Sequence, residues 1–181
     1  MTYRMKRWRS STRRIEDQLI LGIDPGIANV GYACLLVKED TLSLLEADVL
    51  KTKKGITSER LHLIFDFFSN KIEQYAFTSL AMEKIYFNKN VKTALTIEEV
   101  RGVLLLTGSM HQLQIGQYTP LEIKKSLTMF GRAQKTEVKW MAEKILQCEL
   151  PASDDACDAV GVALCHYFNG KHEDGSDDLF D

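Results

Sequence analysis

The chain has 181 residues, 45% of them hydrophobic and 27% charged, which suits one globular domain with a substantial core. Its 23 basic and 25 acidic residues give a formal net charge of -2, which excludes a uniformly basic nucleic-acid-binding chain. The sequence has neither an apolar run of membrane-spanning length nor a signal-peptide pattern, so we expect a soluble, cytoplasmic protein without membrane association.

The two ends of the chain differ in charge from its middle. The segment MTYRMKRWRSSTRR holds six basic residues and no acid, whereas HEDGSDDLFD holds five acids and neither Lys nor Arg. We therefore expect a flexible basic N-terminal extension over residues 1–18, one folded domain over 19–169 and an acidic C-terminal tail over 170–181.

Apolar periodicity predicts three consecutive strands, followed by helices that alternate with strands. Thr119, Pro120 and Glu122 supply an N-cap, a first-turn proline and a capping-box acid for one of the later helices. This order is typical of a mixed α/β sheet covered by helices on both faces. The expected strands are 19–24, 31–37, 42–50, 79–83 and 115–118, and the expected helices are 57–75, 91–112, 120–128, 135–147 and 154–168.

Two carboxylates follow apolar strands at the point where each strand ends. Asp24 ends the run LILGID, and Glu83 ends SLAME. Either residue alone is ordinary turn or strand-exit chemistry. On neighbouring strands, however, the two carboxylates would repel each other unless a cation neutralised them.

A third acidic cluster begins the last predicted helix, in the segment LPASDDACDAVGVALCHYF. Spacings of three or four residues place Asp158 on one helix face with Asp155 or with Asp154, and spacing alone does not choose between them. Acids at two strand ends and on a helix are the oxygen ligands that Mg²⁺ prefers. Two such ions can activate water and stabilise a leaving oxygen, so phosphodiester hydrolysis is the leading chemistry.

Four segments in order resemble the RuvC family of Holliday junction resolvases, which belongs to the ribonuclease H-like superfamily. They are LGIDPGIANVGYACL, AMEKIYFNKNVKTALTIEEVRGVLL, YTPLEIKKSLTMFGRAQKTEVKWM and LPASDDACDAVGVALCHYF. The resemblance implies a ribonuclease H-like mixed five-stranded sheet flanked by helices. It also implies Mg²⁺-dependent junction cleavage by paired symmetric nicks during recombination and repair.

The same resemblance implies roles for individual residues. Asp24, Glu83, Asp155 and Asp158 match the family's catalytic and metal-binding acids, with two Mg²⁺ ions per site and Mn²⁺ able to substitute. Asp154 then becomes a bystander.

DNA contacts are expected from a basic cluster and from two aromatic residues. Lys124 and Lys135 match lysines that face the junction in the family, and Lys125 and Arg132 lie nearby in sequence. Tyr86 stands where the family has an aromatic that stacks on unpaired bases, and we expect the neighbouring Phe87 to share this stacking role.

The resemblance further implies a homodimer formed through the helix near residues 91–112, four-way junction DNA as substrate, and a branch-migration helicase complex as a partner. The four cysteines have no zinc-ligand spacing, and we interpret them as reduced core or surface thiols. We interpret the four histidines as structural.

Three other interpretations compete with a resolvase. An actin- or Hsp70-type ATPase also has a GIDPG-like loop, but it requires a second phosphate loop and a longer chain. A catalytically silent junction-binding module would lack one of the acids. Another ribonuclease H-like nuclease, acting on hybrids or branched DNA, differs only in its substrate.

Overall fold

A computed structural model describes residues 17–39, 41–84 and 91–173 of the chain. Its centre is one five-stranded sheet in the order β3-β2-β1-β4-β5. The strands are β1 (Gln18–Asp24), β2 (Asn29–Lys38), β3 (Thr41–Lys51), β4 (Ser79–Glu83) and β5 (Gln114–Tyr118). The three N-terminal strands pair antiparallel, whereas β4 lies parallel to both β1 and β5, so the predicted mixed sheet is confirmed.

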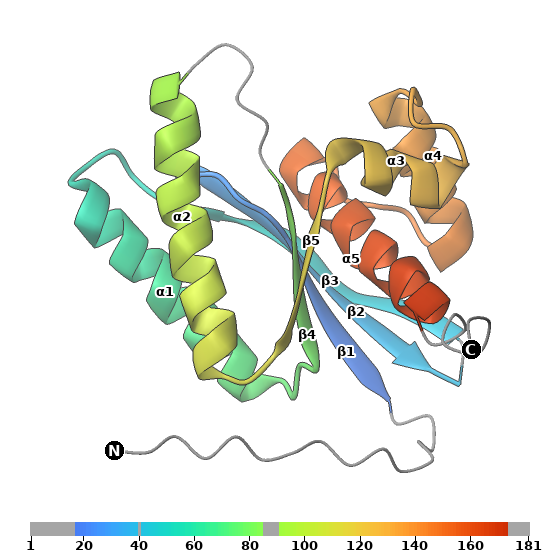
Figure 1. Cartoon of the computed structure of the whole chain (residues 1–181), viewed down its shortest axis with the longest axis horizontal. Coiled ribbons are helices and arrows are strands. Elements are labelled where there is room, and N and C mark those ends of the chain that lie inside the picture. Colours follow the sequence, from blue (N-terminus) through green and yellow to red (C-terminus); the bar gives the residue numbers. More distant parts are fainter. Residues whose placement is uncertain (1–16, 40, 85–90, 174–181) are drawn as a thin grey trace, which may run out of the picture.

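Helices cover both faces of this sheet (Figure 1). Helices α1 (Thr57–Gln74) and α2 (Val91–Met110) pack on one face, and α5 (Asp154–Glu173) crosses the other face beside α3 (Pro120–Thr128) and α4 (Lys135–Leu146). The predicted capping box at Thr119 is present, with Glu122 and Thr119 bonded reciprocally. The last helix runs five residues beyond its predicted end.

Alternation of side chains along the strands divides the core into two halves. Ile20, Ala33 and Ala81 face α5, whereas Leu21 and Met82 face α1 and α2. Because β1 and β4 are covered on both faces, they are nearly continuous apolar runs. In each of these strands the carboxylate, Asp24 or Glu83, is the last residue of the apolar run.

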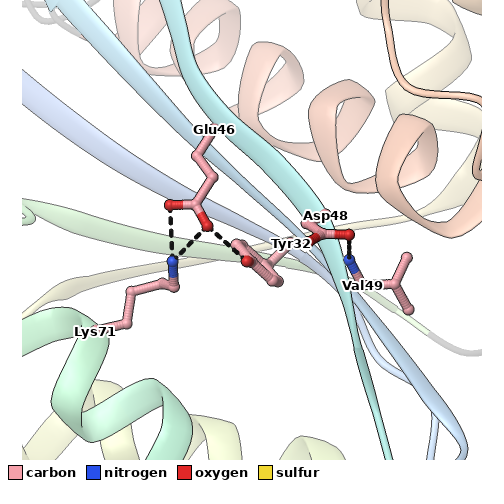
Figure 2. A network of polar contacts seen from close by, with 5 residues as sticks. All are labelled: Tyr32, Glu46, Asp48, Val49 and Lys71. Atoms are coloured by element: carbon pink, nitrogen blue, oxygen red, sulfur yellow. Dashed lines mark hydrogen bonds and ion pairs between the residues drawn. The ribbon is translucent and has the colours of Figure 1, made fainter.

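A partly buried ion pair links β3 to α1 on one face of the sheet (Figure 2). The Nζ of Lys71 donates to both carboxylate oxygens of Glu46 at 2.8 Å, and the hydroxyl of Tyr32 donates to the same carboxylate at 2.6 Å. Burial alone would raise the pKa of Glu46, but these hydrogen bonds from Lys71 and Tyr32 lower it. The network therefore stabilises the fold above the ordinary pKa of a glutamate, and this contribution is lost on acidification.

The four cysteines are free thiols with different exposure. Cys34 and Cys165 are buried in the two halves of the core, Cys157 is partly buried, and Cys148 is exposed after the end of α4. None of the helices in the described ranges is long and apolar enough to cross a lipid bilayer.

Candidate active site

The first two carboxylates lie side by side at one edge of the sheet. Asp24 is the last residue of β1 and Glu83 the last of β4, and the register pairs Ile23 with Met82 just before them. Since Ile23 and Met82 face α1 and α2, the next residue on each strand faces α5. Both acids therefore project on the α5 face at adjacent strand ends.

Helix α5 brings the third and fourth acids to the same place because two strand residues have no side chain. A methyl group on Gly31 of β2 would overlap the main-chain carbonyl of Asp155, and one on Gly22 of β1 would overlap that of Ala159. The helix thus lies directly on the sheet at its N-terminal turns. Asp155 and Asp158 are three residues apart on one helical face, and both are half-buried.

Electrostatic coupling shows that the four acids form one cluster. Burial, followed by the negative charges of Asp158, Glu83 and Asp155, raises the pKa of Asp24 from 3.8 to about 7. Burial and Asp158 also raise the pKa of Glu83. Asp155 is half-buried and contributes to this rise in the pKa of Asp24, whereas Asp154 is exposed; the choice of Asp155 as the partner of Asp158 stays a prediction.

Two of the four predicted basic residues act directly on this cluster. The Nζ of Lys135, at the start of α4, lies 2.6 Å from Oδ2 of Asp158, and its pKa is raised by that contact. Lys124 on α3 is half-buried, and its charge counteracts the rise in the pKa of Glu83. Lys125 and Arg132 are exposed on the same α3–α4 unit.

The donor chemistry of the cluster suits a hard divalent cation. All four side chains offer carboxylate oxygens, and a cation would relieve the repulsion that raises the pKa of Asp24. Among the described residues, no three His, Cys, Asp or Glu side chains are already arranged around a common metal position. In the structure the positive charge beside Asp158 is the ammonium group of Lys135.

The family follows from comparison with known proteins. The model of the family described as crossover junction endodeoxyribonuclease RuvC matches residues 20–166. The chain belongs to the RuvC family. Among its relatives, the crossover junction endodeoxyribonuclease RuvC of Finegoldia magna is 42% identical over 154 residues, which cover 84% of this chain and 94% of that protein.

Solved RuvC structures share the architecture described above. The structure of Thermus thermophilus RuvC has a TM-score of 0.81 and 26% identity, covering 86% of this chain and 97% of that one. The same protein in complex with Holliday junction substrate has a TM-score of 0.78 and 25% identity, covering 86% and 96%. The predicted ribonuclease H-like fold is thereby confirmed.

A buried arginine supports the glutamate of this RuvC-family site, and the sequence interpretation did not include it. Arg101 on α2 is only 5% exposed, and its guanidinium donates to the main-chain carbonyl of Glu83. It also donates to Oε1 of Gln117 on β5 at 2.5 Å and pairs with Glu98 at 3.2 Å. Arg101 therefore joins the ends of β4 and β5 to α2. A single arginine within the otherwise apolar segment VRGVLLL was the available signal.

The remaining predicted residues do not belong to the acidic cluster. Tyr86 and Phe87 lie outside the described residues, so their stacking role stays a prediction. His166 on α5 hydrogen-bonds through Nδ1 to the hydroxyl of Tyr118 at 2.7 Å, which agrees with a structural role.

The raised pKa of Asp24 predicts an unusual dependence of stability on pH. In the unfolded chain Asp24 ionises near pH 4, but in the fold it retains its proton until about pH 7, so the folded state binds more protons between these values. Without divalent cations, the contribution of Asp24 to the free energy of unfolding should therefore fall as the pH rises from 4 to 7, opposite in sign to that of Glu46. At pH 8, Asp24→Asn should raise it by on the order of 1–3 kcal/mol.

Urea denaturation in EDTA at pH 5 and pH 8 measures this effect. The matched control is Asp154→Asn, which removes an exposed charge from the adjacent helix turn and should leave the difference between the two pH values unchanged. An Asp24→Asn protein with the wild-type pH dependence would contradict the prediction.

Proposed function

We propose that the chain is a structure-selective endonuclease that resolves Holliday junctions by paired, symmetric nicks. The observation that carries this proposal is the cluster of four coupled carboxylates at one sheet edge, flanked by Lys124 and Lys135. Membership of a family named for crossover junction cleavage supports the substrate, as does a T. thermophilus relative solved with Holliday junction substrate.

Within this proposal, Asp24, Glu83, Asp155 and Asp158 hold two Mg²⁺ ions, for which Mn²⁺ can substitute. RuvC-family nucleases are metal-dependent, and an all-carboxylate donor set favours these hard ions. Bound ions would supply water activation and stabilisation of charge at the scissile phosphate.

Lys124 and Lys135 bring the DNA backbone to the acids. Lys135 lies 67% exposed while it contacts Asp158, so the same ammonium group can reach a phosphate. Lys124 offsets the negative charge at Glu83, which lowers the repulsion that an incoming phosphate meets. Lys125 and Arg132 extend this positive surface outward.

A homodimer would supply the two sites that paired nicks require. On α2, Leu95, Leu106 and Met110 are 56%, 57% and 59% exposed, and their spacing places them along one side of the helix. Such a stripe suits self-association about a two-fold axis. A branch-migration helicase complex would act on the same junction.

Cleavage of a synthetic mobile four-way junction tests the proposal. The protein is incubated with Mg²⁺ and junctions labelled on each strand in turn, beside linear duplex, flap and RNA–DNA hybrid controls. We expect symmetric nicks on two opposed strands of the junction only. Preferred cutting of flap or hybrid would favour a different ribonuclease H-like nuclease, and binding without cutting would favour a silent junction-binding module.

Lys124→Gln is expected to weaken junction binding about equally for all sequences. It removes one phosphate contact, so the plot of log affinity against log salt should become shallower by about 0.9. Fluorescence anisotropy over a range of NaCl concentrations measures this slope. Lys38→Gln is the control, because Lys38 is exposed at the end of β2 that lies away from the acids. An unchanged slope for Lys124→Gln would show that Lys124 does not contact the DNA.

A further inference from the structure

A second basic cluster, defined by Lys51, Lys53 and Lys54, lies at the end of β3. All three side chains are exposed, and no acid intervenes before Glu59. The whole chain carries a formal charge of -2, so three lysines within four residues make this segment locally basic. None of these three lysines lies on α3 or α4, the helices that carry Lys124 and Lys135.

Strand register places this cluster at the same sheet edge as the acids. Asp24 pairs with Gly31 across β1 and β2, Gly31 pairs with Val49 across β2 and β3, and Lys51 follows Val49 by two residues. Strands lie about 4.8 Å apart and rise about 3.4 Å per residue, so Lys51 is roughly 12 Å from Asp24 in the plane of the sheet. By alternation, Lys51 projects on the α5 face with Asp24.

The segment that bears the lysines is anchored to the loop directly after Asp24. The buried residue Thr52 donates from its main-chain N to the carbonyl of Ala28 at 2.9 Å and from Oγ1 to that of Ile27 at 2.5 Å. Arg60 on α1 donates to Thr52 Oγ1 at 2.8 Å and to the Ile27 carbonyl at 2.9 Å. These bonds hold Lys51 and Lys53, on either side of Thr52, at a defined position relative to the first acid.

The two basic clusters flank the acids from opposite sides. Lys124 is on α3, which follows β5, whereas Lys51 ends β3 at the other end of the strand order. In Figure 1 the connection from β3 to α1 leaves this edge on the side away from α3. A duplex that lies across the acids and reaches Lys124 on one side therefore meets the β3 cluster on the other.

We propose that Lys51, Lys53 and Lys54 form a second phosphate-binding surface, which holds a duplex arm of the substrate away from the scissile bond. This inference rests on the proposed junction-cleaving function. A separation of roughly 12 Å corresponds to about four base pairs of B-DNA, at 3.4 Å per step on each strand. The contacts are to phosphates and do not read sequence.

The test compares two variants that each remove two exposed positive charges. In Lys51→Gln/Lys53→Gln, the slope of log junction affinity against log salt should become shallower by roughly 1–2. In Lys38→Gln/Lys144→Gln, which changes β2 and α4 away from this edge, the slope should stay as in the wild type. Lys51→Arg/Lys53→Arg retains the charges and should restore wild-type binding.

Neutral methylphosphonate groups, placed one at a time in the junction, locate the contacts. Neutral groups at some phosphates of one duplex arm should weaken binding by the wild-type protein but not by Lys51→Gln/Lys53→Gln. The phosphates whose replacement no longer weakens binding by Lys124→Gln should be different ones. An unchanged salt slope, or the same positions lost in both variants, would overturn the inference. If wild-type protein cuts no junction, the proposed function fails; if it cuts and the two double Gln variants behave alike, only this inference fails.

Discussion

Asp24→Asn is expected to abolish junction cleavage, with a loss of at least about a thousandfold in the single-turnover rate. Burial and the negative charges of Asp158, Glu83 and Asp155 all raise the pKa of Asp24, so this carboxylate lies within the shared negative potential of the site. Asparagine keeps the shape of the side chain but removes the charge that would hold a divalent cation. Loss of several kcal/mol of transition-state stabilisation gives a rate effect of this size.

Single-turnover cleavage in saturating Mg²⁺ measures this loss, with binding followed separately in Ca²⁺. Junction affinity should be retained or increased, since one source of repulsion toward phosphate is removed. Asp154→Asn is the matched control, because it changes a neighbouring exposed acid and should keep activity within a few-fold of the wild type. Normal nicking by Asp24→Asn, or a comparable loss in Asp154→Asn, would contradict the assigned acid set.

Gly31→Ala is expected to reduce both stability and cleavage. The new methyl group would overlap the carbonyl of Asp155, so either β2 or the first turn of α5 must move. Overpacking of this kind costs about 1–3 kcal/mol in the free energy of unfolding. A displacement of about 1 Å at a catalytic group can cost about a hundredfold in rate, so the remaining folded protein should also cut slowly.

Urea denaturation and single-turnover cleavage of the same preparations separate the two effects. Gly55→Ala is the control, because a methyl group there meets no atom within 4 Å, and it should change stability by less than about 0.5 kcal/mol. A Gly31→Ala protein with wild-type stability and rate would show that α5 does not depend on this close contact.

Much of the fold could be predicted because local signals and tertiary structure agree. Strand 79–83 and helix 120–128 match their predicted bounds, the first because an apolar run ends at a charged residue and the second because Thr119 begins a capping box. The end of α5 was predicted at residue 168, but the helix continues to Glu173. Asn169 and Gly170 are residue types common at helix C-termini, yet α5 continues through both of them.

Two of the acids were predicted as strand-end residues and two from their spacing on a helix, but how the four lie relative to one another required the fold. Helical spacing could not choose between Asp154 and Asp155, and only the way α5 lies on Gly31 brings Asp155 toward Asp24. Arg101 was missed for the same reason. Its partners, the carbonyl of Glu83 and the side chain of Gln117, are on two other elements, so no local pattern could have indicated them.

The uneven exposure of the four thiols makes selective chemical labelling possible. Burial raises the pKa of Cys34 to about 12 and that of Cys165 to about 11, and it also raises the pKa of Cys157, so reactive thiolate is scarce at all three positions. Cys148 is exposed beyond the far end of α4, about 17 Å along that helix from Lys135. A maleimide dye should therefore modify the native protein at Cys148 first, providing a fluorescent reporter of junction engagement without an engineered cysteine.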